Sequence, residues 1–258
     1  MSETNSIVVT GAGAGIGRAI LMHFLGLGWR VAGLDKDTVA LDELRAALPE
    51  GQALMTGCDV GDEAAVKAAF AEIGKWLGKN PLTVLVNNAG LADPYCGPLE
   101  TLALADWQAW IDASLTAAFL CSRAAVPLLR RATGEDSSAS IVNISSTRAL
   151  MSEPETFAYA AAKGGLDAFT HAMAVSLGPD IRVNSIRPGW IETAPWQKAA
   201  DRQEPQHSKR DRQQHPVGRV GKPEDIAGAV EWLAGAGFVT GQAIAVDGGM
   251  TVKMIYAE

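Results

Sequence analysis

The chain has 258 residues, of which 48% are hydrophobic and 20% charged, a balance that suits one large α/β domain and argues against disorder. The net charge of −7 argues against broad nucleic-acid binding, which needs a basic surface. No run of ~18 apolar residues predicts a membrane span, and the polar first five residues do not resemble a signal peptide. Cys58, Cys96 and Cys121 lack metal-ligand spacing, so we expect reduced thiols in a cytoplasmic protein and no metal site.

The first predicted strand and helix flank a glycine-rich loop. Ile7–Val9 is a short apolar run, typical of a buried strand, and it leads into TGAGAGIG at residues 10–17. A helical pattern follows and stops at Gly28. Glycines let the backbone approach a pyrophosphate, and the helix N-terminus offers free N–H groups. Ile16 stands where the usual G-x-G-x-x-G pattern has its last glycine, so an ordinary glycine-rich turn is the alternative.

The second predicted strand, Arg30–Leu34, ends at Asp35. A carboxylate about 20 residues beyond such a loop binds both hydroxyls of an adenosine ribose. It would also repel a 2′-phosphate, so the sequence favours NAD over NADP. Lys36 follows directly and keeps NADP open, and a solvated turn residue is the other interpretation of Asp35.

Strands and helices alternate along the remaining chain. We expect helices over Thr38–Ala47, Glu63–Leu77, Leu104–Arg131, Phe157–Leu177 and Pro223–Ala234, and strands over Gln52–Thr56, Thr83–Val86, Ser140–Ile144, Arg182–Ile186 and Ala243–Val246, with a polar loop over Thr133–Ser138. This order predicts an α/β fold: one Rossmann-type, doubly wound parallel sheet of about seven strands, with helices on both faces, in a single domain over 1–258. Ligands are then expected at the carboxyl ends of the strands.

Tyr159 and Lys163 lie four residues apart in the predicted helix Phe157–Leu177, on one face. A free tyrosine loses its proton near pH ~10, and a nearby cation favours the phenolate, so this pair suits general acid/base chemistry. The alternative is a packed tyrosine ring beside a solvated lysine. Ser146 follows a predicted strand and could orient a substrate oxygen, although a serine at a strand end is usually structural.

The polar segment 193–214 holds five basic and three acidic side chains. It is either a solvated surface helix or mobile loop, or part of a lid over the substrate, around residues 190–218.

Together these motifs resemble the short-chain dehydrogenase/reductase family over nearly the whole chain. Residues 10–17 resemble its TGxxxGIG loop, Asn87-Asn88-Ala89-Gly90 its NNAG segment, and Tyr159 with Lys163 its YxxxK motif. Ser146 stands thirteen residues before Tyr159, where the family's catalytic serine usually lies. Pro188-Gly189 and Thr193 resemble the segment that touches the nicotinamide end.

The resemblance implies a role for each motif. Tyr159 exchanges a proton with the substrate oxygen, Lys163 favours the phenolate and binds the nicotinamide ribose, and Ser146 positions the substrate. A hydride moves between substrate and nicotinamide. The implied cofactor-binding residues are Gly11, Gly15, Ile16, Gly17, Asp35, Asp59, Val60, Asn87, Ala89, Gly90, Tyr159, Lys163, Pro188, Gly189, Ile191 and Thr193.

Ser114 is a departure from the family pattern. Many relatives carry an asparagine within a segment resembling Trp107 to Leu115, and this chain has Ser114 at that place. The asparagine is thought to hold a water in a proton relay from the lysine. A serine hydroxyl both donates and accepts, so Ser114 could hold a water, or the relay is rerouted.

The substrate-binding residues expected beside Ser146 and Tyr159 are Arg148, Trp190 and Trp196, with Glu153 as a further candidate. Arginine favours carboxylate, sulfonate, phosphate or a hydroxyl-rich sugar. The hypothesis is a polar, hydroxylated substrate, an aldose or a polyol, which could be acidic. A surface or interface salt bridge is the alternative for Arg148.

The leading function is therefore an NAD-dependent sugar or alcohol dehydrogenase. The alternatives are a carbonyl or 3-oxoacyl reductase using NAD(P)H and an inactive dinucleotide-binding redox sensor. The resemblance also implies a homotetramer. The apolar C-terminal residues would dock on a partner subunit or on their own: Val252, Met254, Ile255 and Tyr256.

Overall fold

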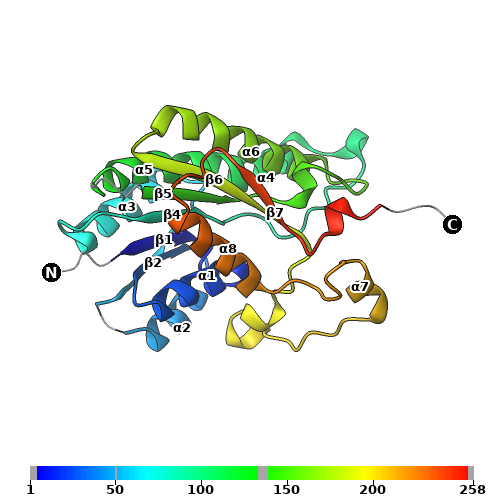
Figure 1. The fold of residues 1–258 in the computed structure, drawn as a ribbon, viewed down its shortest axis with the longest axis horizontal. Coiled ribbons are helices and arrows are strands. Elements are labelled where there is room, and N and C mark those ends of the chain that lie inside the picture. The colour runs from blue at the N-terminus through cyan, green and yellow to red at the C-terminus, as the bar shows by residue number, and fades with distance from the viewer. Residues whose placement is uncertain (1–4, 50, 133–138, 255–258) are drawn as a thin grey trace.

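The computed structural model describes residues 5–49, 51–132 and 139–254, which form one seven-stranded sheet with helices on both sides (Figure 1). All strands are parallel, in the order β3-β2-β1-β4-β5-β6-β7. They are β1 (Ser6–Thr10), β2 (Arg30–Asp35), β3 (Ala53–Gly57), β4 (Val84–Asn87), β5 (Ala139–Ile144), β6 (Ile181–Pro188) and β7 (Ala243–Val246). The strand order reverses between β1 and β4, which places a ligand crevice at their carboxyl ends.

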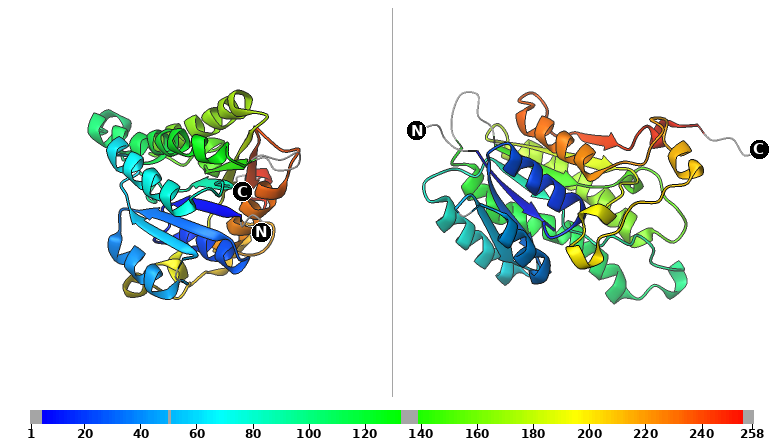
Figure 2. Two further views of the ribbon diagram at one scale, coloured as in Figure 1. Left: turned by 90° about the vertical axis from the view of Figure 1, so that its left-hand side faces the viewer. Right: turned by 90° about the horizontal axis from the view of Figure 1, so that it is seen from below.

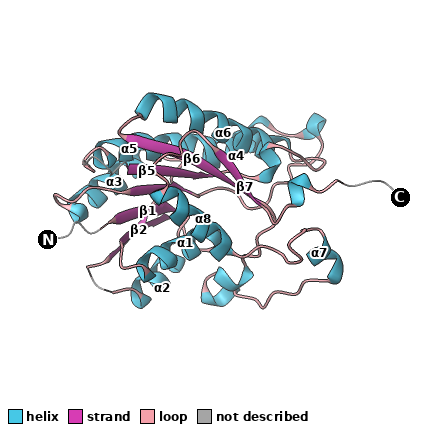
Figure 3. Ribbon diagram, viewed as in Figure 1, coloured by secondary structure: helices cyan, strands magenta, loops and turns pink. Residues whose placement is uncertain are grey.

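Two helical layers cover the sheet (Figures 2 and 3). One face packs against α1 (Gly15–Gly26), α2 (Thr38–Ala47) and α8 (Pro223–Gly235). The other packs against α3 (Glu63–Leu77), α5 (Ala117–Leu129) and α6 (Phe157–Leu177). The remaining helices are α4 (Leu104–Ile111), α7 (Lys209–Gln213) and the short turns η1 (Leu99–Thr101), η2 (Asp112–Thr116), η3 (Thr147–Ala149), η4 (Ala194–Trp196), η5 (Ala199–Asp201) and η6 (Met250–Val252). The predicted doubly wound fold is confirmed.

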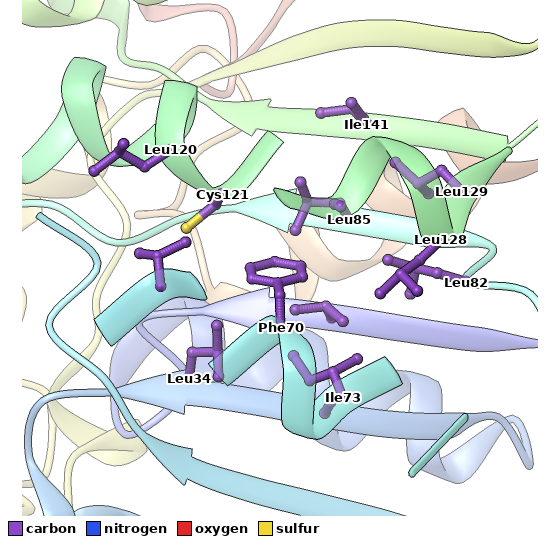
Figure 4. Close-up of a cluster of buried hydrophobic side chains, with 14 of the residues drawn as sticks. Leu34, Phe70, Ile73, Leu82, Leu85, Leu120, Cys121, Leu128, Leu129 and Ile141 are labelled. Carbon is purple, nitrogen blue, oxygen red and sulfur yellow. The ribbon is translucent and has the colours of Figure 1, made fainter. Parts of the chain in front are cut away.

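The apolar runs of the central strands form the core because both sheet faces are covered. In the layer under α3 and α5, Phe70 packs among Leu85 of β4 and Leu120 of α5 (Figure 4). Burying one such side chain stabilises the fold by roughly 1.5–3 kcal/mol. Aspartate side chains cap two helices: Asp37 accepts from the first turn of α2, and Asp62 from that of α3.

The segment Leu104–Arg131, predicted to be long and mostly helical, is helical as far as Leu129 and contains a π-helical turn that was not predicted. A π-helical turn, η2, separates α4 from α5, and α5 ends at Leu129 after an internal Pro127. The Asp112 carboxylate stabilises the turn by accepting hydrogen bonds from the side chains of Gln108 and Thr116, both 2.9 Å. The turn, Asp112–Thr116, contains no proline or glycine, so the sequence carried no local signal of it.

By length and composition, Leu104–Leu129 is apolar enough to cross a membrane. In the structure Leu120, Cys121, Ala125 and Leu129 are buried in the layer between the sheet and α3. Packing inside the domain accounts for the apolar character of these four positions, and 44% of the most apolar window of the helix is buried.

Smaller differences concern the ends of elements. The third strand is Ala53–Gly57, β6 runs from Ile181 to Pro188, and α8 ends at Gly235. The predicted loop Thr133–Ser138 lies outside the described residues, as do Ile255 and Tyr256. Val252 and Met254 are 83% and 74% exposed, so they do not dock on their own subunit.

Candidate active site

Hydrogen bonds fasten the glycine loop to the segment after β4. Thr10 Oγ1 accepts from the backbone N–H groups of Asn88 and Ala89, both at 3.0 Å. The Asn88 amide donates to the carbonyls of Thr10 (3.0 Å) and Gly11 (3.3 Å). Thr10 and Asn88 were missing from the predicted set although both lie inside recognised motifs. They could have been identified from the pairing of β1 with β4, because this pairing places the ends of the two strands, and so the two motifs, side by side.

The glycine loop has the shape that a pyrophosphate requires. Gly11 and Gly15 have φ of +65° and +56°, in the left-handed region that favours glycine. A Cβ on Gly17 would lie 2.1 Å from the Gly11 carbonyl oxygen, so no side chain fits there. Ala14 gives α1 no side-chain cap, which leaves the first N–H groups of the helix available to an anion. These residues, with Ile16 among them, fit the phosphates of a dinucleotide.

Asp35 lies at the carboxyl end of β2 and faces the loop. Its Oδ2 accepts from Gly13 N at 2.8 Å, and its Oδ1 from Asp37 N at 2.9 Å. Among the residues that the structure describes, no lysine or arginine forms an ion pair with it. Each carboxylate oxygen keeps a lone pair for a ribose hydroxyl. Asp59 and Val60 follow β3 at the same edge, where Asp59 accepts from Gly61 N and Val60 is buried.

The three residues expected to carry the chemistry lie at one edge of the sheet. Lys163 on α6 is 4% exposed, and its Nζ donates to the Ile144 carbonyl at 2.9 Å. The same Nζ lies 5.6 Å from the centre of the Tyr159 ring. Ser145 Oγ donates to the Lys163 carbonyl at 3.0 Å, which ties the end of β5 to α6 and sets Ser146 beside it. Ser146 is buried, and its Oγ accepts from Arg148 N at 3.1 Å.

The π-helical turn brings Ser114 to Lys163. Ser114 is 4% exposed, and both its side chain and the Lys163 ammonium lie next to Gly90. A Cβ on Gly90 would lie 3.1 Å from Ser114 Oγ and 3.5 Å from Lys163 Nζ. Asn87, at the end of β4, turns inward instead and hydrogen-bonds to Ser122 and Asn143, so its side chain is structural.

The chain after β6 returns over the glycine loop. Pro188 ends the strand, and Gly189 packs so closely on Asp247 that a Cβ would lie 2.7 Å from the Asp247 Cβ. Ile191 forms a bridge with Gly221. Thr193 then reaches the loop, since a Cβ on Gly15 would lie 3.4 Å from the Thr193 side chain.

The predicted substrate-binding residues have polar partners. Arg148 forms an ion pair with Glu153, and its guanidinium lies 6.0 Å from the centre of the Tyr95 ring. Its buried Nε has no hydrogen-bond partner within the described part of the chain. The salt bridge that the sequence left open for Arg148 is therefore present, and it neutralises the charge.

The two tryptophans face different neighbours. The Trp190 ring packs against the rings of His207 and His215, at 5.6 and 6.2 Å between centres. The Trp196 indole donates to Glu224 of α8 at 3.2 Å. Trp190, which is 39% exposed, thus packs within the segment 190–218, whereas Trp196 links this segment to α8.

Comparisons with known proteins agree with this geometry. A family model described as enoyl-(acyl carrier protein) reductase matches residues 11–251. An uncharacterized oxidoreductase from Thermotoga maritima is 44% identical over 268 aligned positions, which cover 100% of both chains. The 2-(S)-hydroxypropyl-CoM dehydrogenase 3 of Xanthobacter autotrophicus is 38% identical, over 95% of this chain and 96% of its own.

Two solved structures extend the comparison. The aldohexose dehydrogenase of Thermoplasma acidophilum has a TM-score of 0.84 at 30% identity, over 99% of this chain and 97% of its own. The 3-ketoacyl-(acyl-carrier-protein) reductase of Brucella melitensis, complexed with NADH, has a TM-score of 0.84 at 28% identity, over 97% and 100%. Sequence, fold and the edge that joins the glycine loop to Tyr159 and Lys163 agree, and the protein belongs to the short-chain dehydrogenase/reductase family of nicotinamide-dependent oxidoreductases that act on alcohols and ketones.

Proposed function

We propose that the protein is an NAD-dependent dehydrogenase of a sugar or polyol. The observation that carries the cofactor choice is Asp35, whose carboxylate stands at the adenosine end of the crevice with no lysine or arginine paired to it in the described part of the chain. A carboxylate there accepts from ribose hydroxyls and repels a 2′-phosphate. Lys36 is exposed beside it and is the reason to test NADP in parallel.

The side chains at the end of β5 and on α6 have complementary roles. Tyr159 accepts the hydroxyl proton of the substrate, and the buried ammonium of Lys163 lies 5.6 Å from the centre of its ring. Ser146 holds the substrate oxygen in line with the tyrosine. A bound nicotinamide supplies the acceptor for the hydride from the same carbon. Ser114, next to Gly90 and Lys163, is the residue through which a water would return the proton to solvent.

The charges around the pocket favour a neutral substrate over an acidic one. Arg148 is compensated by Glu153, so the pair has no net charge while it still offers donors and acceptors to hydroxyl groups. Lys198 and Arg202 in the segment 190–218 are likewise paired, with Asp37 and Glu43. The likeness to an aldohexose dehydrogenase supports this proposal.

A carbonyl or 3-oxoacyl reductase using NAD(P)H is the second candidate, favoured by the likeness to a ketoacyl reductase complexed with NADH. The intact trio of Ser146, Tyr159 and Lys163 argues against an inactive redox sensor. We further propose a cytoplasmic homotetramer in which Val252 and Met254, exposed in one subunit, are covered by another. Sedimentation as a stable monomer at micromolar concentration would contradict the tetramer.

The deciding experiment follows NAD reduction by absorbance with a panel of aldoses, polyols, sugar acids and secondary alcohols, with NADP in parallel. The proposal expects turnover with NAD and a neutral sugar or polyol. Oxidation of NADPH by keto substrates, with silence on the panel, would replace it by the reductase. Arg148→Ala should raise KM for the best sugar, and an unchanged KM would remove Arg148 from the pocket.

A further inference from the structure

The first half of the segment 190–218 is fastened to the two helices that frame the adenosine side of the crevice. The views in Figures 1 and 2 agree that this segment lies next to α1 and α2. Lys198 Nζ donates to Asp37 Oδ2 at 2.7 Å, just before α2. Arg18, on α1 and only 7% exposed, donates through Nη1 to the Gln197 carbonyl at 3.4 Å. The contact area is thus polar, although one of its arginines is buried.

Glu43 of α2 is the centre of these contacts. Its Oε1 accepts from Arg18 Nη2 at 2.5 Å and from Arg202 Nη2 at 3.3 Å. Its Oε2 accepts from the backbone N–H of Ala199 at 2.7 Å. One carboxylate therefore joins α1, α2 and η5. The hydrogen bond from Ala199 and then that from Arg18 hold the pKa of Glu43 below its usual value, so the group is ionised at neutral pH.

The partners of Glu43 divide into two sets with different roles. Arg18 and Glu43 both belong to the body of the domain, so their ion pair persists when the segment lifts and keeps the carboxylate oriented. Ala199 and Arg202 belong to the segment and lose their contacts when it lifts. A carboxylate held in place by one arginine makes better hydrogen bonds to the arriving groups, because less side-chain entropy is lost.

The segment that Glu43 fastens lies over the glycine loop. Residues 193–197 end against Gly15, where a Cβ would lie 3.4 Å from Thr193 and 3.9 Å from Gln197 Nε2. The Gln197 amide in turn donates to the Thr193 carbonyl at 3.3 Å, so the two residues are coupled. A dinucleotide bound on the loop would therefore lie beside this stretch.

We propose that Glu43 is a positioning residue that fastens residues 197–202 over the glycine loop and thereby slows the release of the cofactor. The statement about the cofactor rests on the proposed function, whereas the fastening itself does not. Among the described residues, the hydrogen bonds of the Glu43 carboxylate come from Arg18, Ala199 and Arg202, and none comes from Ser146, Tyr159 or Lys163.

The test compares Glu43→Gln with Asp42→Asn. Both remove one negative charge from α2, but Asp42 pairs with Arg45 on the same helix and, among the described residues, forms no hydrogen bond or ion pair with the segment. Trypsin cleaves after Lys198 and Arg202, so cleavage of the cofactor-free protein reports how often the segment lifts. We expect Glu43→Gln to be cleaved there about ten-fold faster, the loss of one charge-assisted hydrogen bond, and Asp42→Asn at the wild-type rate.

Dissociation of NADH, followed by fluorescence after rapid mixing, tests the consequence. Glu43→Gln should release NADH about ten-fold faster, and Arg202→Gln, which removes only the exposed pair with Glu43, should release it about two- to three-fold faster. The apparent melting temperature of each variant must stay near that of the wild type, which separates lifting from unfolding.

The outcomes are distinct. Equal cleavage of Glu43→Gln and wild type overturns the fastening. Faster cleavage with unchanged NADH release overturns the control of cofactor release. If the wild type binds no nicotinamide dinucleotide, the proposed function fails, while the cleavage comparison still decides whether Glu43 holds the segment.

Discussion

The two sides of the dinucleotide crevice are held in different ways. On one side, the glycine loop is fixed by backbone approach and by buried hydrogen bonds to Thr10, with room for no Cβ on Gly17. On the other, residues 197–202 are held by charged side chains that solvent reaches, such as Arg202 at 46% exposure. Steric fixation does not respond to salt or acid, whereas exposed ion pairs are screened and titrate. The crevice therefore has a rigid floor, the glycine loop of residues 10–17, and a cover, residues 197–202. The stability of the cover depends on salt and pH.

The largest expected effect comes from removing the Tyr159 hydroxyl, which takes away the proposed acid/base group and leaves both sides of the crevice unchanged. Tyr159→Phe should lower kcat/KM by about 10²–10⁴-fold, the usual contribution of a positioned general acid or base. Tryptic cleavage after Arg202 should stay at the wild-type rate, because the contacts of residues 197–202 are kept. Retention of more than half of the activity would show that another group exchanges the proton.

The next test breaks the floor. In Gly17→Ala the new Cβ would lie 2.1 Å from a backbone oxygen, so the loop must shift and dinucleotide binding should be lost. Gly26→Ala, in the last turn of the same helix, meets no atom within 4 Å and should be neutral or stabilising by up to ~1 kcal/mol. Calorimetric titration with NAD and thermal unfolding distinguish them. Normal affinity in Gly17→Ala would contradict a sterically fixed floor.

Salt should loosen the cover alone. At about 1 M ionic strength the screening length falls to about 3 Å, which weakens exposed pairs such as those of Lys198 and Arg202. We expect tryptic cleavage after Arg202 to become several-fold faster, while amide exchange in the glycine loop and β1 is unchanged. Parallel acceleration of exchange in both regions would mean that they open as one unit.

Acid should loosen the cover only at low pH. Hydrogen bonds from Lys198 and from the backbone lower the pKa of Asp37, as those from Ala199 and Arg18 lower that of Glu43. Since these pKa values are lower in the folded state, the stabilisation is complete above the unfolded values, near pH ~4, and is lost as pH falls through the folded ones. Exchange of the Ala199 amide, followed by NMR, should depart from its ordinary pH dependence only below about pH 4. Loss of protection near neutral pH would point to a histidine instead.

The smallest expected effect concerns the reactivity of the cysteines, two of which lie in the core beneath both sides of the crevice. Burial, followed by the nearby Asp59, raises the pKa of the Cys58 thiol to about 11, and burial also raises that of Cys121. Cys96 is only half-buried. At neutral pH we expect a thiol reagent to modify Cys96 alone in the native protein and all three cysteines after denaturation. Native labelling of Cys121 would show that the layer under α5 opens readily.

Local patterns were sufficient to predict the fold and the floor of the crevice. The limits of α2, α3, α6 and β7 agree with those predicted, because capping aspartates and apolar periodicity mark such ends within a few residues. The prediction of the glycine loop, Asp35 and the Tyr159–Lys163 pair had the same basis, since each depends on spacing within one strand–loop–helix unit or one helix turn. The parallel sheet then brought these motifs to one edge.

Three features could not be predicted from local patterns: the π-helical turn, the ion pair of Arg148 and the contacts of residues 197–202 with α1 and α2. The π-helical turn Asp112–Thr116, which carries the buried Ser114, has no proline or glycine to mark it in the sequence. The ion pair of Arg148 with Glu153 formed where the sequence allowed either a paired or a free arginine. The sequence determined the sheet, the glycine loop and the position of the acid/base pair. Only the tertiary structure joined Arg18 to Gln197, 179 residues away, and seated the cover on α2, because charge pairing across such a separation leaves no periodic signal in the chain.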